Sequence, residues 1–178
     1  MFRFGCMLSA LVLCACGGSG SEPTTPLPQR PIAVSRTVRT VEGGFAFAIQ
    51  QANPQALLRS SATLLRDTSF AVATVGSGTY VGQYQIATAN TDSRESQIHE
   101  GTVSMTVDFA DSFITGVGDD LTFTGVIEGA WLSGTSTFQG MPGTLGGGAG
   151  RNQVVGTLVG GNGNISFAGG FAALPTRP

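Results

Sequence analysis

Apolar residues alternate with hydroxyl-bearing residues along most of the chain, and this period of two constrains the fold more than any other feature. In residues 101–109, GTVSMTVDF, the apolar residues Val103, Met105 and Val107 alternate with threonine and serine. Such alternation is typical of a β-strand with one buried face and one solvated face. We therefore expect strands there and at residues 37–41, 45–49, 68–75, 79–88, 121–128, 130–138, 151–159 and 164–171.

Turn-forming residues separate the alternating segments. Glycine accounts for 27 of the 178 residues, about twice its usual share of roughly 7%, and it gathers at residues 76–78, 118–120, 140–150 and 160–163. We expect these runs to be hairpin turns. About eight short strands at this spacing predict an all-β fold, as a closed antiparallel barrel or a sandwich. The chain has too few aromatic residues for two membrane girdles, so we expect a soluble β-barrel of about eight strands.

Residues 54–66 depart from this pattern. Asn53 and Pro54 suit the N-cap and the first position of a helix, and the leucines at positions 57, 58, 64 and 65 follow at helical spacing. Arg59 and Arg66 would lie on the opposite, solvated face. The segment predicts one short helix over residues 54–66 that covers an opening of the barrel; two short strands are the alternative.

The first sixteen residues, MFRFGCMLSALVLCAC, have the composition of an export signal. Arg3 supplies the positive charge, and the mostly apolar run that follows is about eight residues long, short of the roughly 20 that a membrane span needs. The closing residues LCAC at 13–16 resemble the lipobox of bacterial lipoproteins. This resemblance implies a lipoprotein signal peptide over residues 1–15 and acylation of Cys16. A plain secretory signal cleaved nearby is the alternative.

Removal of residues 1–15 would leave Cys16 as the only cysteine, so we expect no disulfide within the chain. Residues 17–31, GGSGSEPTTPLPQRP, combine flexible Gly and Ser with extended Pro. We therefore expect a lipid-anchored flexible linker over residues 16–35 and the β-barrel domain over residues 36–178. Two or more acyl groups on Cys16 would hold the protein stably on a membrane.

Charge and composition exclude several classes of function. Only 11% of the residues are charged, the net charge is −2 and lysine is absent, so no basic surface is available for nucleic acid. The sequence contains no nucleophile elbow and no glycine-rich phosphate loop. A single histidine cannot build a histidine-rich metal site. We therefore expect no enzymatic activity and no cofactor.

His99 is the one histidine of the chain and lies in the polar residues 93–100, SRESQIHE. Surroundings this polar predict a solvated histidine in a loop before a strand. The alternative is an axial haem ligand.

Two further groups are candidates for a site. The aspartates at positions 108, 111, 119 and 120 offer carboxylates for Ca²⁺, but they lack the spacing of a calcium loop and predict solvated turns. Trp131 falls on the polar face of its strand. We expect it to pack in the barrel wall; the alternative is an exposed aromatic anchor for a partner, formed together with Tyr84 or Tyr80.

The segments YVGQY at 80–84, GTVSMTVDF at 101–109, LTFTGVI at 121–127, GTL at 156–158 and ISFAGGF at 165–171 resemble the barrel domain of transferrin-binding-protein-like surface lipoproteins of Gram-negative bacteria. The resemblance covers residues 80–171. It implies a lipid-anchored, eight-stranded barrel that binds a host protein or haem, or whose partner is unknown. Residues 150–155, GRNQVV, replace the family's aromatic-rich Gly-Pro-Asn-Ala stretch, and its handle domain and large receptor-binding loops have no counterpart. We expect the fold to carry over, and transferrin binding not to.

These observations predict a non-enzymatic, lipid-anchored cell-envelope protein that presents its barrel to a partner protein or ligand. The acyl groups would hold it at the outer membrane, on the periplasmic or the surface-exposed face. One alternative is a small-ligand carrier, with haem as the ligand and His99 as its contact. The other is a structural envelope lipoprotein without a ligand.

Overall fold

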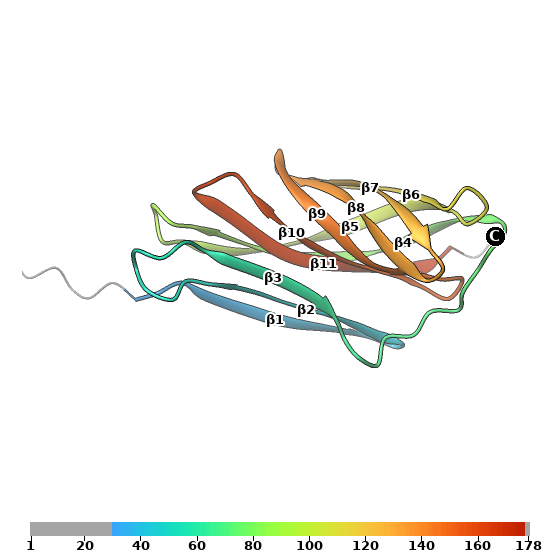
Figure 1. Ribbon diagram of the computed structural model, residues 1–178, viewed down its shortest axis with the longest axis horizontal. Helices are drawn as coiled ribbons and strands as arrows, with labels where there is room; N and C mark the ends of the chain where they lie inside the picture. Colours follow the sequence, from blue (N-terminus) through green and yellow to red (C-terminus); the bar gives the residue numbers. More distant parts are fainter. Residues whose placement is uncertain (1–29, 177–178) are drawn as a thin grey trace, which may run out of the picture.

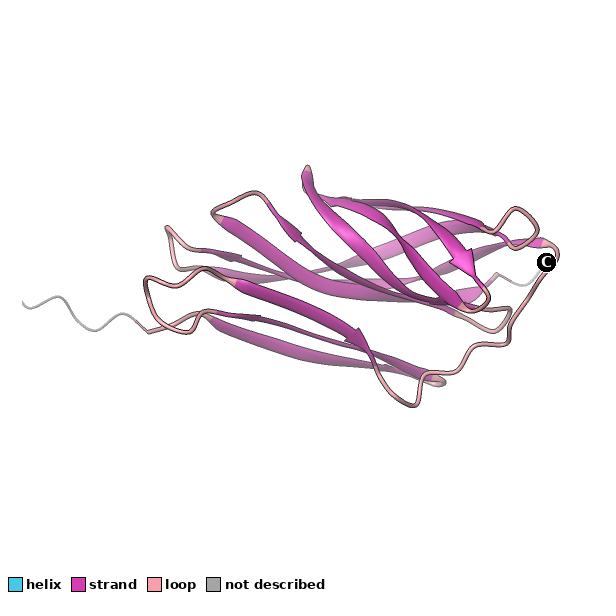
Figure 2. Ribbon diagram, in the orientation of Figure 1, coloured by secondary structure: helices cyan, strands magenta, loops and turns pink. Residues whose placement is uncertain are grey.

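The computed structural model describes residues 30–176, and every regular element in this range is a β-strand (Figures 1 and 2). The strands are β1 (Ala33–Thr40), β2 (Gly43–Gln50), β3 (Arg59–Leu64), β4 (Ser77–Asn90), β5 (Ser96–Asp108), β6 (Phe113–Gly118), β7 (Leu121–Glu128), β8 (Trp131–Phe138), β9 (Met141–Ala149), β10 (Val154–Gly161) and β11 (Ile165–Pro175). Residues 30–176 therefore hold no helix able to cross a membrane. The expected signal peptide, Cys16 and most of the expected linker lie outside the described residues.

Eight of the strands, β4 to β11, form a closed antiparallel barrel in which β11 pairs with β4. The predicted all-β fold and the eight-stranded barrel are confirmed. Its strands differ in part from those expected: β6 was not predicted, β9 occupies a predicted turn, and residues 68–75 form no strand. Segments 37–41 and 45–49 belong instead to a second sheet, of order β1-β2-β3, which lies along the barrel wall (Figure 1).

The helix predicted for residues 54–66 is wrong. Residues 53–56 form a turn in which the Ala56 amide donates to the Asn53 carbonyl at 3.0 Å, and residues 59–64 form β3. Along β3, Ala62 and Leu64 face the barrel and are half-buried, whereas Leu57 is 82% exposed. Pairing with β2 and burial of every second side chain outweigh the helical spacing of the leucines.

The barrel interior is filled by apolar side chains. Phe123 and Phe171 stack with ring centroids 4.6 Å apart, and Phe138 lies 6.3 Å from Tyr84 and 5.6 Å from Phe167. Other buried members of this core are Ile86, Val103, Met105, Val107, Phe109, Ile114, Leu121, Ile127, Leu132, Met141, Leu145, Val154 and Leu158. A small eight-stranded barrel is just wide enough for such side chains to fill, and burying them supplies the main stabilising free energy.

Threonines cover much of the outer barrel surface, as the alternation predicts. Thr106, Thr115, Thr124, Thr135 and Thr144 lie directly opposite one another across five successive strands, β5 to β9, and all five are exposed. The hydroxyl-bearing face therefore points to solvent and the apolar face points inward.

Many glycines of the barrel lie in strands rather than in turns, which corrects the prediction for residues 140–150. Most of that run is strand β9. At Gly116 an added Cβ would overlap the ring of Phe123, and at Gly156 it would overlap the ring of Phe171. These glycines are needed because the aromatic ring of a neighbouring strand fills the space beside them.

The three-stranded sheet packs face to face against the outside of the barrel. Phe45, Phe47 and Ile49 of β2 are buried between the two sheets, over β10 and β11. The barrel wall beneath them carries small residues, and a Cβ at Gly170 would lie 2.8 Å from the Phe45 ring. Small side chains on the wall therefore let the two sheets approach each other.

The molecule has two distinct ends. We define the proximal end by the barrel turns 91–95, 119–120, 139–140 and 162–164, and the distal end by the turns 109–112, 129–130 and 150–153. The described chain begins at the proximal end, where Arg94 donates to the carbonyls of Arg30 at 3.5 Å and Pro54 at 2.7 Å. Strand β1 then runs toward the distal end, where β11 also finishes (Figure 1).

Candidate functional site

Exposed apolar side chains gather at the distal end. Of the ten large hydrophobic side chains exposed within residues 30–176, only Leu57 and Val117 lie elsewhere. The other eight, which we call the distal apolar residues, are Val41, Val72, Val75, Val81, Phe113, Val126, Trp131 and Leu174. They come from the β1–β2 turn, the segment before β4 and the distal parts of five barrel strands. Exposed apolar side chains that lie close together are typical of interaction surfaces.

One part of this surface lies on β6, β7 and β8. Phe113 pairs directly with Val126, and Trp131, at the start of β8, is 70% exposed. The packing expected for it in the barrel wall is therefore wrong, and so is a cluster with Tyr80 or Tyr84, because both tyrosines point into the barrel and are buried. Trp131 is thus an exposed aromatic side chain of the kind that anchors protein partners.

The other part borders a cleft between the two sheets, with a volume of about 520 Å³. This volume is within the roughly 300–1,000 Å³ of small-ligand sites. One wall consists of residues 38–42, from β1 and its turn, and the other of residues 81–83 of β4 and 172–174 of β11. Val81 and Leu174 are direct neighbours across β4 and β11 and both are partly exposed, so the cleft is apolar on its barrel side.

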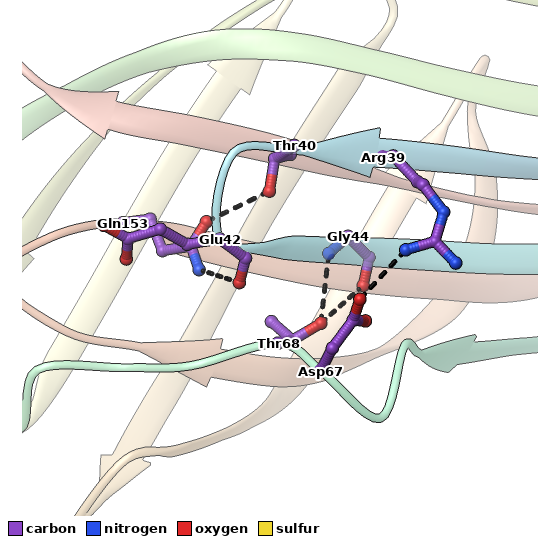
Figure 3. A network of polar contacts seen from close by, with 7 residues as sticks. All are labelled: Arg39, Thr40, Glu42, Gly44, Asp67, Thr68 and Gln153. Carbon is purple, nitrogen blue, oxygen red and sulfur yellow. Dashed lines mark hydrogen bonds and ion pairs between the residues drawn. The ribbon is translucent and has the colours of Figure 1, made fainter.

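Gln153 ties the two sides of the cleft together (Figure 3). Its Nε2 donates to the carbonyls of Glu42 at 2.9 Å and Ser69 at 2.8 Å, and Thr40 Oγ1 donates to its Oε1 at 3.4 Å. The side chain is only 1% exposed, and these bonds offset the cost of burying its amide. The sequence places Gln153 in a strand without distinguishing it, since nothing in the alternation marks a buried amide.

In the same region, two polar contacts join the segment after β3 to β1 and β2 (Figure 3). Arg39 forms an exposed ion pair with Asp67 at 2.9 Å. The Thr68 hydroxyl accepts from the Gly44 amide and donates to the Gly44 carbonyl, each at 3.0 Å. The segment after β3 is therefore held against the start of β2.

His99 lies within β5, not in the predicted loop, and it belongs to the proximal end. Its ring nitrogens each have a polar neighbour: Nδ1 lies 3.5 Å from Gln139 Nε2, and Nε2 lies 3.0 Å from the Thr88 hydroxyl. The ring also meets Phe138 edge-on at 5.4 Å. It lines a cleft of about 240 Å³, smaller than the roughly 300–1,000 Å³ of small-ligand sites. A metal ligated by His99 would have to displace one of these two contacts.

Tyr80 and Tyr84 are buried members of the barrel core. The Tyr80 hydroxyl donates to the Gly150 carbonyl at 3.0 Å and so holds the β9–β10 turn. Burial raises the pKa of Tyr80, and the charge of Arg151 opposes this rise in part. Burial also raises the pKa of Tyr84, with a further rise from Asp119 and Asp120 and a smaller opposing effect of a backbone hydrogen bond. Both side chains are therefore neutral well above neutral pH.

The four aspartates considered for Ca²⁺ do not form one site. Asp108 and Asp111 lie at the distal end, whereas Asp119 and Asp120 lie at the proximal end. Asp108 Oδ1 accepts from the amides of Ala110 at 2.9 Å and Asp111 at 3.1 Å, so it stabilises its own turn. Within residues 30–176, no three His, Cys, Asp or Glu side chains come together in a way that could hold a metal ion.

Comparison by sequence finds no relative: no family model matches the chain, and no curated protein matches it. Comparison with solved structures does find similar proteins. A point mutant of transferrin binding protein B from Actinobacillus pleuropneumoniae H49 matches with a TM-score of 0.56 and 15% identity, over 94% of this chain and 91% of that chain.

Two further transferrin binding protein B structures match to a similar degree. The isotype 1 protein from serogroup B Neisseria meningitidis gives a TM-score of 0.54 and 15% identity, over 80% of this chain and 35% of that chain. A point mutant from Haemophilus parasuis Hp5 gives a TM-score of 0.54 and 14% identity, over 82% of this chain and 35% of that chain. This chain therefore spans about a third of the length of these two proteins.

The likeness extends beyond residues 80–171, for which the sequence predicts it. The barrel strands begin at Ser77, so a match over 94% of the chain includes the three-stranded sheet as well. At these identities the likeness is one of fold. The chain thus has a fold similar to that of transferrin binding protein B, in its barrel and in the small sheet beside it.

Proposed function

We propose that this chain is a non-enzymatic, lipid-anchored binding protein of the cell envelope, which presents its distal end to a partner protein. One observation carries the proposal: eight of the ten exposed large hydrophobic side chains within residues 30–176 lie at the distal end. The described chain begins at the opposite, proximal end. A protein held by its N-terminus would thus expose the apolar surface away from its anchor.

The proposed anchor is Cys16, acylated as the lipobox-like residues 13–16 imply. Residues 16–29 would connect it to Arg30 at the proximal end. At about 3.1 Å per extended residue, this linker can reach roughly 40 Å. We propose that the protein is located at the outer membrane, because it resembles surface lipoproteins of Gram-negative bacteria.

A protein partner is better supported than a haem-like ligand. The barrel interior is filled with side chains such as Phe123, Phe138 and Phe171, and both ring nitrogens of His99 already have partners. The similar structures are named for binding a protein, transferrin. That name supports a protein partner as a class, and we do not assign transferrin itself to this chain.

Metabolic labelling with a fatty acid analogue tests the anchor. The chain should carry the label, Cys16→Ala should lose it, and Cys14→Ala should keep it. Label that persists on Cys16→Ala contradicts the proposal, because the acyl group would then be elsewhere.

Site-specific photo-crosslinking tests the binding end on intact cells. A photoreactive residue in place of Trp131, at the distal end, should form an adduct with a partner protein. The same residue in place of Asn162, at the proximal end, is the matched control. Adducts formed only from the proximal position would contradict the assignment of the distal end.

A further inference from the structure

We propose that the free edge of β1, together with the cleft beside it, receives an extended strand of the partner protein. That strand carries a carboxylate and an apolar side chain two residues apart. The inference rests on the proposed function in one respect, namely that the chain binds a protein. Beyond the proposed function, it specifies the place where a segment of the partner binds and the side chains that this segment presents.

β1 is an edge strand with unpaired backbone groups. In the order β1-β2-β3, no strand within residues 30–176 pairs with the outer edge of β1. The Gln51 amide donates to the Ile32 carbonyl at 2.9 Å, and antiparallel pairs alternate between bonded and non-bonded. Every second residue of β1 therefore directs its amide and carbonyl outward, namely Ala33, Ser35, Thr37 and Arg39. Such an edge is a template for a further strand.

A strand added to this edge would place every second side chain on the barrel side. Val34 and Val38 lie opposite the buried Ile49 and Phe45 of β2 and pack toward the barrel with them. The side chains of an added strand directly opposite Val34 and Val38 would share that face. The apolar cleft of about 520 Å³, between residues 38–42 and the barrel wall, lies where they would point. Recognition by strand addition combines backbone bonds with side-chain pockets in this way.

Arg36 sets the charge that the added strand must carry. It lies opposite Phe47, hence on the barrel face of β1, yet it is exposed. The ion pair found within residues 30–176 is the one between Arg39 and Asp67, which leaves Arg36 without a carboxylate partner in that range. A carboxylate opposite Arg36 would supply one, and an apolar residue opposite Val38 would enter the cleft.

The charge of the small sheet favours the same partner. Residues 30–76 contain five arginines against Glu42 and Asp67, a net charge of +3, whereas residues 77–176 contain two arginines against eight acids, a net charge of −6. A second copy of this chain on the same edge would bring two like-charged sheets together, including both Arg36 side chains. An acidic strand of another protein therefore fits this edge better than a second copy does.

Fluorescence anisotropy with a labelled, end-blocked octapeptide, Val-Thr-Val-Thr-Glu-Thr-Val-Thr, tests the inference on the full chain purified in a non-ionic detergent. Its glutamate and valines fall on one face, so it fits β1 in either direction. We expect saturable binding, and binding about fivefold weaker when lysine replaces the glutamate. Arg36→Glu should reverse this preference, and Arg59→Glu, an arginine on the opposite face of the same sheet, should not.

Thr37→Pro provides a second, independent test, because it removes an outward-directed amide without breaking a bond to β2. Thr37→Pro should bind neither the glutamate peptide nor its lysine variant. Thr37→Ala, which keeps the amide, should bind both peptides as the parent chain does. No binding to the parent chain, or equal binding by Thr37→Pro, overturns the inference. So does a dimer that Thr37→Pro dissociates, since the edge would then serve a second copy. If Thr37→Pro fails to fold, the charge reversal at Arg36 decides.

These outcomes are separate from those that test the proposed function. Acylation of Cys16 and crosslinking through Trp131 depend on neither Arg36 nor the β1 edge. A failed peptide experiment with a positive crosslink would leave the binding protein and remove only this mode of recognition.

Discussion

Glycines inside the barrel determine where its aromatic rings fit. At Gly156 a Cβ would overlap the ring of Phe171, whereas at Gly78 the nearest atom would be Cε2 of Tyr80, at 3.4 Å. Neither glycine has a positive φ. Replacement by alanine therefore has a similar effect on the backbone at both positions, and the difference between them lies in the space available to the side chain.

We expect Gly156→Ala to lower the free energy of unfolding by about 1–3 kcal/mol, because the added methyl group forces the Phe171 ring to move. Gly78→Ala should change the free energy by no more than about 0.5 kcal/mol. Guanidinium unfolding curves of the two variants measure both values. Equal midpoints would show that the space beside Phe171 is not limiting.

The two tyrosines make the stability of the barrel sensitive to alkaline pH. Their folded-state pKa values lie above the ordinary tyrosine value of about 10, mainly because of burial. The stability that this contributes is fully present below the unfolded pKa of about 10 and is lost as pH rises through the folded pKa. Lysine is absent from the chain, so no lysine titrates in the same range.

We therefore expect the free energy of unfolding to fall as the pH rises above about 10. Tyr84→Phe should flatten this decline, since a phenylalanine cannot ionise. Unfolding curves between pH 8 and pH 11 measure the effect, with the exposed Thr102→Ala as a control that leaves the slope unchanged. An identical slope in Tyr84→Phe would assign the decline to other groups.

At the scale of elements, the contact between the small sheet and the barrel depends on a buried apolar layer and on one amide. Phe45 and Phe47 supply the apolar part, and Gln153 bonds to both the β1–β2 turn and the segment after β3. Gln83 is a matched exposed glutamine in the same cleft.

Gln153→Ala should lower the free energy of unfolding by about 1–3 kcal/mol, because the carbonyls of Glu42 and Ser69 lose their partner. Hydrogen exchange should become faster in β1 and β2, and should change less in β5 to β8. Gln83→Ala should leave both measurements unchanged. Uniform acceleration over all strands would mean that the two sheets open as one unit.

The strands that the sequence predicts poorly are those whose core side chains come from their neighbours. In β6, FITGVG, the inward Gly116 lies beside Phe123 of β7, and in β9 the inward Gly143 would meet Phe167. Alternation is a property of one strand, whereas packing is shared between several. Strands with their own apolar residues, β5 and β7 above all, were predictable for that reason.

At the scale of the molecule, the two ends face opposite ways along the barrel. Sequence periodicity does not say which sheet a strand joins, so β1 and β2 were assigned to the barrel. Some of the distal apolar residues have a signal in the sequence, since Val81, Val126 and Leu174 are apolar where the alternation predicts polar residues. Their common location appears only once the strands are paired.

We expect the acylated protein on lipid vesicles to expose its distal end more than its proximal end. A polymer-linked maleimide should react faster with Asp111→Cys, in a distal turn, than with Asn162→Cys, in a proximal turn. In detergent the two rates should be similar, which controls for intrinsic reactivity. Equal rates on vesicles would argue against anchoring through the N-terminal side.

Closure of the barrel depends on β11, which is synthesised after the other seven barrel strands. Tyr80 of β4 pairs with Pro175 of β11, and the Thr176 amide donates to the Thr79 carbonyl at 2.9 Å. Until β11 emerges, both β4 and β10 present open edges that invite aggregation, and contacts this distant in sequence form slowly. A chain that lacks β11 would therefore lose the closed barrel as a whole, because the seven strands made before it cannot close without it.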